Sequence, residues 1–572
     1  MDNIYYPNIK RTMNYLIFIS YVFTLVFSAD KEIPYIMNNN NIIEFNSSYM
    51  INKITFSRTG NSLYNYLLGI FEASNFITFS DALPIAIIKE EHLQNSNDNE
   101  ISLDINVPNP YKYIKYNPPK KGTLYIKDIK IIGHEYSENE NIKKKQLFRI
   151  TNLPLMIINT ENSVEPNTRD YYINSQIIII KSKKIDINES ASIKLRGHST
   201  AIVPKKPYKI KFEKKQKLLG MSGKFKSWAI LANYYDKSLI RNILAFNISA
   251  IIGLEFTPRC EPVDLILNGN FKGNYFVCDQ IEVKEGRVEI EEISDDNITG
   301  GYLLEVDPRA TEEEKHFITE KKLIGEIKYP DSDDITEDQE NYINQYLNTL
   351  EDDLHNNSLE YIDLNSFCRY FLIQNLCGDV DYVFSSFYIT KRKGDDKLYF
   401  GPVWDYDLFL DNEARLIPTN KKPKFVLDDS DSTDTSTNFI MTIFKIKNVS
   451  KEMNETLTEL IEKGFYFETF KNFIDEKKEL LLESANLNML KWYNSKIGEG
   501  VKDYSDCLDI INDYIETRFD SLPQLLNEFN SDGGNLNNVV KENENKGFHI
   551  FGIVNFENIF LFYFLYIFIF II

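Results

Sequence analysis

Apolar segments at both ends of the 572-residue chain limit the part that can fold as a globular core. Lys10 and Arg11 precede an apolar run that ends at Ser28, where small residues suit cleavage. This pattern favours a secretory signal peptide at 1–28 over an N-terminal membrane anchor, because the run is short for a span. The other apolar run, Ile559 to Ile572, has no charged residue. We therefore expect the folded part to end near residue 529.

The C-terminal end has the order of features that precedes attachment of a GPI anchor. Small residues follow residue 529, a polar linker occupies 530–547, and a hydrophobic tail occupies 548–572. No basic residue follows the tail, which disfavours an ordinary spanning helix, although a single C-terminal span or a buried helix remains an alternative. We predict passage through the secretory pathway to the cell surface, with the tail as membrane anchor.

Composition excludes some functions. Acidic side chains outnumber basic ones by 84 to 64, which gives a net charge of −20 and disfavours a nucleic-acid partner. The five cysteines show no CxxC spacing, so a zinc site is not expected. A disulfide between Cys260 and Cys278 is compatible with the sequence, but spacing alone gives no connectivity. Sequons for a glycoprotein occur at Asn46, Asn188, Asn247, Asn297, Asn356, Asn448 and Asn454.

Hydrophobic patterning divides the chain into a β-rich module at 29–146 and a larger domain at 147–529. Within the module, Tyr111 to Tyr116 and Leu124 to Ile132 alternate around a Pro/Gly turn, which predicts an antiparallel hairpin with one wet face. In the larger domain, strand patterns dominate up to about Asp307 and helical spacing follows Glu337. Strands followed by helices in one unit indicate an α+β fold.

Positive charge is concentrated in one stretch of this acidic chain. Lys194 to Arg241 contains 13 Lys and Arg residues but only two acids, Glu213 and Asp236. If 205–212 is a strand, Lys206 lies on its inner face with Tyr208 and the apolar residues. A buried ammonium group needs an anionic partner such as polyphosphate, whereas the alternative is a solvated basic face.

Two acidic patterns could supply metal ligands and a base. Asp405 and Asp407 alternate with Trp404, Tyr406 and Leu408. In an extended chain, the two carboxylates would project the same way from Cα atoms about 6.5–7 Å apart. Such a pair could hold Mg²⁺ against a phosphate, or could form the wet face of an amphipathic strand. Asp381 follows an apolar helical stretch and is either a catalytic base or an ordinary loop acid.

Ten segments, in this order, resemble the CotH kinase family of spore-coat and cell-surface proteins. The resemblance covers roughly residues 150–525. The matching segments are Arg196 to Thr200, Lys205 to Phe212, Leu218 to Met221, Trp228 to Asn233, Ser238 to Asn242, Val263 to Gly269, Gly273 to Tyr275, Asp279 to Ile281, Gly300 to Asp307 and Trp404 to Asp407. The Tyr111 to Gly133 stretch also resembles the edge of a galactose-binding-like β-sandwich.

The resemblance implies an atypical protein-kinase-like fold that uses ATP and Mg²⁺ or Mn²⁺ to phosphorylate Ser or Thr of surface or secreted proteins. It implies a site made of the nucleotide-binding residues Arg196, Lys206, Lys209 and Asn242, the catalytic Asp381, and the metal ligands Asp405 and Asp407.

Two positions depart from the family pattern. Ser386 stands five residues after Asp381, where kinase-type loops commonly have Asn, and Asp279 stands where relatives usually have Glu. The alternative function is therefore a catalytically weak surface adhesin or coat protein with the same fold.

Overall fold

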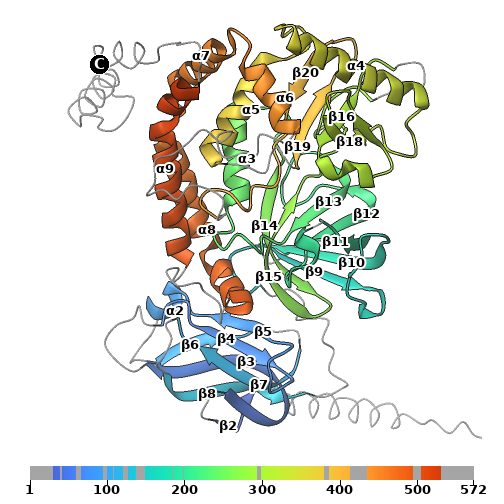
Figure 1. Cartoon of the computed structure of the whole chain (residues 1–572). Coiled ribbons are helices and arrows are strands. Elements are labelled where there is room, and N and C mark those ends of the chain that lie inside the picture. Colours follow the sequence, from blue (N-terminus) through green and yellow to red (C-terminus); the bar gives the residue numbers. More distant parts are fainter. Residues whose placement is uncertain are drawn as a thin grey trace, which may run out of the picture. The chain divides into compact units, whose positions relative to one another are not determined.

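The computed structural model has a mixed α+β fold (Figure 1). It describes residues 30–529 except 39–41, 59–65, 95–99, 107–108, 120–125, 137–148, 183, 198, 293–297, 379–384, 413–434 and 494–503. The chain forms two compact units. The first comprises the described parts of Met1–Ala232, Glu261–Val277 and Leu480–Gly498, and the second comprises those of Asn233–Cys260, Cys278–Glu479 and Glu499–Ile572.

The first unit begins with an eight-stranded sheet, whose main strand order is β1-β8-β3-β7-β4-β5. Its strands and one short helix are β1 (Lys31–Glu32), β2 (Ile36–Met37), β3 (Ile42–Arg58), β4 (Ile70–Ser74), β5 (Leu83–Ile87), α2 (Glu90–Gln94), β6 (Glu100–Asp104), β7 (Tyr111–Asn117) and β8 (Ile126–Glu135).

The hairpin predicted for Tyr111 to Ile132 is wrong, although both of its strands exist. β7 and β8 each pair antiparallel with β3, β7 along its first half and β8 along its second. The 17-residue β3 is long enough to take both partners, and alternation within a strand does not reveal which strand lies beside it.

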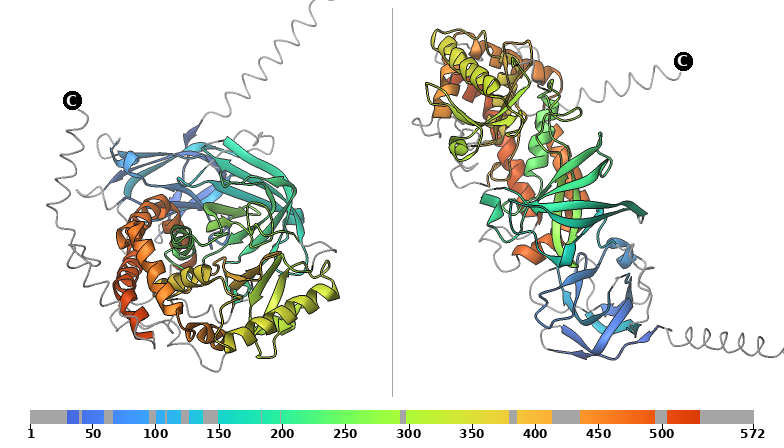
Figure 2. Two further views of the ribbon diagram at one scale, coloured as in Figure 1. Left: turned by 90° about the horizontal axis from the view of Figure 1, so that it is seen from above. Right: turned by 90° about the vertical axis from the view of Figure 1, so that its right-hand side faces the viewer.

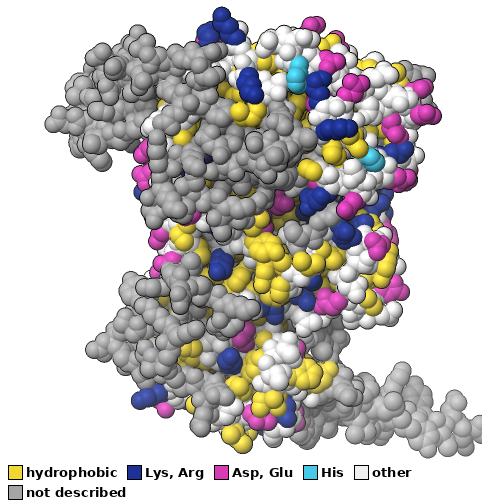
Figure 3. Space-filling view, viewed as in Figure 1, with side chains coloured by type: hydrophobic (Ala, Val, Ile, Leu, Met, Phe, Trp, Pro, Cys, Tyr) yellow, Lys and Arg dark blue, Asp and Glu magenta, His cyan; other side chains and the backbone are white. Residues whose placement is uncertain are grey.

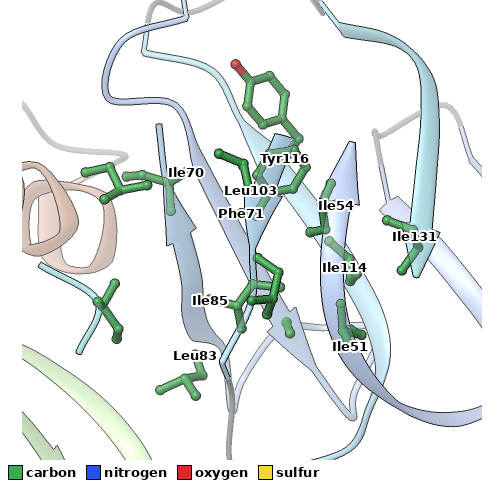
Figure 4. Packing of buried hydrophobic residues seen from close by; sticks show 14 of the residues in the cluster. Ile51, Ile54, Ile70, Phe71, Leu83, Ile85, Leu103, Ile114, Tyr116 and Ile131 are labelled. Carbon is green, nitrogen blue, oxygen red and sulfur yellow. The ribbon is translucent and has the colours of Figure 1, made fainter. Parts of the chain in front are cut away.

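The core of this sheet is built almost entirely from Ile, Leu, Phe and Tyr side chains (Figure 4). Ile54, Phe71 and Ile114 are completely buried, and the Phe71 ring lies 4.9 Å from that of Tyr116. The same apolar cluster continues into Leu155 and other residues of the next sheet. Burial of apolar surface therefore joins the N-terminal sheet to the rest of the first unit.

The next sheet closes into a barrel with the strand order β10-β11-β12-β13-β15-β14-β9. Its strands are β9 (Leu155–Thr160), β10 (Ile173–Lys181), β11 (Lys184–Leu195), β12 (Tyr208–Gln216), β13 (Phe225–Leu231), β14 (Cys260–Leu267) and β15 (Asn270–Cys278). Inward residues such as Tyr208, Ile210 and Phe212 alternate with outward ones, as the sequence predicts for 208–212.

The second unit contains a five-stranded sheet with the order β17-β18-β16-β19-β20. These strands are β16 (Tyr302–Val306), β17 (His316–Ile318), β18 (Ile324–Tyr329), β19 (Phe387–Lys391) and β20 (Leu398–Phe400). Its helices include α3 (Arg241–Ile251), α4 (Glu337–His355), α5 (Leu364–Cys377), α6 (Thr435–Phe444), α7 (Val449–Glu462) and α9 (Tyr504–Phe529). The buried helix α5 packs against α3, α7 and α9 (Figure 2).

Several predicted elements are confirmed. α5 occupies the apolar stretch from Leu364 to Cys377, and α9 includes the predicted helix from Cys507 to Phe529. The amphipathic stretch 456–482 is divided between α7 and α8 (Phe467–Tyr493), with Gly464 at a φ of +95° between them. Cys260 and Cys278 form a disulfide, and Cys368, Cys377 and Cys507 are buried free thiols.

The predicted processing segments at 1–28, 530–547 and 548–572 lie outside the described residues, as does the predicted domain boundary at 146. Between residues 30 and 529, the described helices include none with the length and apolar character needed to cross a membrane. Acidic side chains are frequent over α4 on the face shown in Figure 3.

Candidate functional site

A buried ion pair at the start of α3 organises the candidate site in the second unit. The carboxylate of Asp236 accepts hydrogen bonds from Arg241 Nη1 at 2.6 Å and from the Arg241 backbone N–H at 2.9 Å. Asp236 is 0% exposed and Arg241 is 4% exposed. The Arg241 guanidinium also donates to the carbonyls of Phe409 at 2.7 Å and Leu410 at 3.1 Å. Arg241 therefore ties α3 to the loop that contains Asp405 and Asp407.

Asn242 binds the same loop at Tyr406, the residue before Asp407. Its Oδ1 accepts a hydrogen bond from the Tyr406 backbone N–H at 2.7 Å, and the Tyr406 hydroxyl donates to Gln374 on α5 at 3.0 Å. Asn242 is 5% exposed, and its amide oxygen holds the loop backbone through this bond. A contact between Asn242 and a nucleotide stays a prediction.

The loop from Trp404 to Leu408 is not the extended strand that alternation predicts. Asp405 has a φ of +69°, in the left-handed region, and a turn follows at Asp407. Asp405 is exposed, whereas Asp407 is only 7% exposed. The two carboxylates therefore do not share one wet face. Trp404 instead packs on Phe246 of α3, with ring centroids 5.8 Å apart.

Asp407 is in an unfavourable place for an isolated negative charge. Burial, followed by the charges of Asp405 and Asp236, raises the pKa of its carboxyl well above the usual range, and Arg241 only partly opposes this effect. A proton or a bound cation removes the cost of such a charge. The electrostatics of Asp407 therefore fit a cation-binding site.

The donor set also suits Mg²⁺. Within the described residues, no group of three or more His, Cys, Asp or Glu side chains is gathered as a complete metal site. Mg²⁺ usually takes only one or two carboxylates and completes its shell with water and substrate phosphates. Asp405 and Asp407 are the residues that would hold it.

The predicted nucleotide-binding residues Arg196, Lys206 and Lys209 all lie in the first unit. Lys206 is half-buried, and its ammonium donates to the Ala201 carbonyl at 2.8 Å. Lys209 is half-buried on the outward side of β12, and the Arg196 backbone N–H donates to the Pro207 carbonyl. Their contacts with a nucleotide stay predictions.

The prediction that Lys206 occupies the inner face is wrong, because period-two alternation applies only from Tyr208, where β12 begins. The fully buried lysine of this segment is Lys205, which is 0% exposed. Its ammonium donates to the Asn274 carbonyl and to Asn488 Oδ1, at 2.5 and 2.8 Å, and lies 4.6 Å from the centre of the Tyr275 ring.

The two residues that depart from the family pattern, Asp279 and Ser386, both lie in the second unit and make bonds within it. Asp279 is 3% exposed and bonds Arg259 at 2.6 Å and Arg287 at 3.1 Å. These three residues line a small pocket together with Gln280 and Glu289. Ser386 has a φ of +59°, and its backbone N–H donates to Glu305 at 3.1 Å.

Sequence reasoning missed the structural importance of Asp236 and Arg241. A signal was present, because Asp236 is one of only two acids in the basic stretch and lies five residues before Arg241. The predicted base, Asp381, lies in 379–384, outside the described residues. Its place relative to Asp405 and Asp407 stays a prediction.

Comparison with known proteins identifies the family. The family model for CotH kinase protein matches residues 193–522, which includes both Arg241 and the Asp405–Asp407 loop. The chain therefore belongs to the CotH kinase protein family. No curated protein matches the chain. A solved structure of CBM62 from Clostridium thermocellum Xyl5A is 20% identical, with a TM-score of 0.15, over 18% of this chain and 75% of that one.

Proposed function

We propose that this protein is a secreted or surface-anchored atypical protein kinase that transfers phosphate from ATP to Ser or Thr residues of other proteins. Membership of the CotH kinase protein family supports a kinase-like fold and activity. The observation that carries the proposal is Asp407, a buried carboxylate near two others, in a loop that Arg241 of the Asp236–Arg241 ion pair anchors.

The chain's own residues would act mainly by positioning, which is what phosphoryl transfer chiefly requires. Arg241 and Asn242 fix the backbone on both sides of Asp407, so the carboxylate stays in place when its charge is opposed by a cation. Asp405 and Asp407 would hold Mg²⁺ or Mn²⁺. When bound, the metal would neutralise charge on the transferred phosphate. Asp381 is proposed to orient the attacking hydroxyl and accept its proton.

The direct test is transfer of radiolabelled phosphate from ATP by the purified protein, with Mg²⁺ or Mn²⁺ and including autophosphorylation. Asp381→Asn should leave ATP affinity within about threefold and lower the transfer rate at least about a hundredfold, because a general base contributes about 10²–10⁴. An equal loss of ATP binding would assign Asp381 to the metal site instead.

Transfer and binding assays on the same purified protein distinguish the kinase from the alternative function, a surface adhesin with weak or no catalysis. Wild-type protein that transfers no phosphate under any metal condition, yet binds a cell-surface or matrix protein tightly, would replace the kinase proposal. Protein that transfers phosphate only with metal and ATP would support it.

A further inference from the structure

Eight exposed lysines gather at one end of the barrel in the first unit, and we call them the lysine face. They come from β10, β11, β12, β13 and the turns that join them. They are Lys181, Lys184, Lys211, Lys214, Lys215, Lys217, Lys224 and Lys226.

Strand pairing brings these lysines together. β11 pairs with β12, and β12 pairs with β13, so the β10–β11 and β12–β13 hairpins lie side by side in the barrel wall (Figure 1). Gln216 is opposite Phe225, which places Lys215 and Lys217 next to Lys224 and Lys226. The ammonium of Lys181 lies 3.4 Å from the Leu219 carbonyl, which brings the other hairpin tip to the same end.

Among the described residues of the first unit, the lysine face keeps a net positive charge. No lysine of the face makes an ion pair with another residue that the structure describes. The exposed acids Asp186, Glu189 and Glu213 are interspersed among the lysines and leave a net charge of +5. This surface belongs to a chain whose total charge is −20, so it stands out as a local site for anions.

We propose that the lysine face binds an acidic segment of a partner protein in an extended conformation. Lys211, Lys214 and Lys215 are exposed along the second half of β12, with the exposed Glu213 among them. Spaced carboxylates can align with the lysines and avoid Glu213. The evenly dense charge of a nucleic acid, about one per 1.7 Å, would meet the three acids as well.

The residue types on the lysine face support the same partner. It contains no arginine, although arginine forks are the usual ligands for phosphate and sulfate groups. Within the described parts of β10 to β13 and their turns, the aromatic side chains, such as Phe212, Phe225 and Trp228, all point inward. Stacking surfaces for bases are therefore missing from this face.

The test is fluorescence anisotropy of a labelled peptide of alternating Glu and Ala with the purified full-length protein, without ATP. In the face variant, Lys211, Lys215, Lys224 and Lys226 are each changed to Glu. The control variant changes four exposed lysines of the second unit to Glu, namely Lys445, Lys447, Lys451 and Lys471. Both variants therefore change the net charge of the chain by the same amount. Because the four lysines changed in each variant are exposed, both variants should fold, as circular dichroism would verify.

The face variant should bind the peptide at least about tenfold more weakly in about 50 mM salt, and the control variant within about twofold of wild type. Replacing the same four lysines by Gln should give an intermediate loss, and provides the measurement if charge reversal unfolds the protein. Equal weakening in both variants would overturn the proposal, because only net charge would then matter. Tighter binding of heparin or single-stranded DNA than of the peptide would also overturn it. Binding is measured without phosphate transfer, so the result is independent of kinase activity.

Discussion

Two buried aspartates, one in each unit, are stabilised in different ways. Asp264 on β14 is 1% exposed and accepts hydrogen bonds from the Thr151 hydroxyl at 2.6 Å and the Ser484 hydroxyl at 2.5 Å. Burial raises the pKa of Asp264 to about 6 despite these bonds. Asp407 has carboxylates as neighbours, and its pKa is raised well above the usual range.

The difference distinguishes an acid whose hydrogen-bond partners the fold supplies from the acid that we propose as a metal ligand. Hydroxyl groups around Asp264 provide the hydrogen bonds that a buried polar group needs, so no ligand is required there. The surroundings of Asp407 increase the cost of its charge, which a proton or the proposed cation would remove. A strongly perturbed pKa in a polar site thus indicates function only when the fold itself does not supply the partner.

The largest expected effect comes from breaking the ion pair beside Asp407. Arg241→Ala leaves Asp236 buried without its partner and frees the carbonyls of Phe409 and Leu410. Removing one member of a buried pair costs about 3–5 kcal/mol of unfolding free energy. Urea denaturation would measure it, with Arg309→Ala, at an ion pair whose arginine is 57% exposed, as the control. A loss no greater than that of the control would contradict a stabilising role for the Asp236–Arg241 ion pair.

Asp407→Asn should separate stability from activity. The substitution removes a repelled charge, so the melting temperature in EDTA should stay equal or rise. Phosphate transfer should fall by about a hundredfold to a thousandfold, as when one preorganised electrostatic group is removed. Melting scans with and without Mg²⁺ and ATP would show whether ligand-induced stabilisation is lost as well. Destabilisation in EDTA would mean that Asp407 is a structural residue like Asp264.

The pH dependence of stability should identify Asp264. Its folded pKa of about 6 lies above the ordinary value of 3.8, so the folded state holds the proton more tightly. The stabilisation is therefore complete below pH 3.8 and is lost as pH rises through about 6, by about 2–3 kcal/mol. The unfolding free energy should change less with pH across this range for Asp264→Asn than for wild type. An unchanged slope would remove Asp264 as the cause.

Thr151→Val should have the smallest effect of the four. It removes one donor to Asp264 and keeps the shape of the side chain, which should cost about 1–2 kcal/mol of unfolding free energy near neutral pH. The loss should shrink in acid, where Asp264 is protonated. Thr349→Val, at an exposed helical hydroxyl, is the control. A loss that is independent of pH would show that Thr151 acts through packing alone.

Helices with a clear apolar period were predictable, and α9 is the best example, because its buried residues, such as Cys507, Ile511 and Tyr514, recur at helical spacing. The pairing of β7 and β8 with β3 was not, because it depends on residues about 70 positions away. The residues Asp405 and Asp407 were recognised from their pattern, but their unequal exposure follows from the left-handed turn at Asp405 and the bonds from Arg241 and Asn242. Such contacts exist only after folding.

The left-handed end of α5 limits how the sequence can drift during evolution. Gly378 has a φ of +68°, and a Cβ placed there would lie 2.0 Å from the hydroxyl of Tyr514 on α9. A larger residue at 378 would thus face both backbone strain and a collision. Relatives should keep glycine at this position, and any that replace it should also carry a smaller residue at the position of Tyr514. Positions 378 and 514, which are 136 residues apart in sequence, should then change together among relatives.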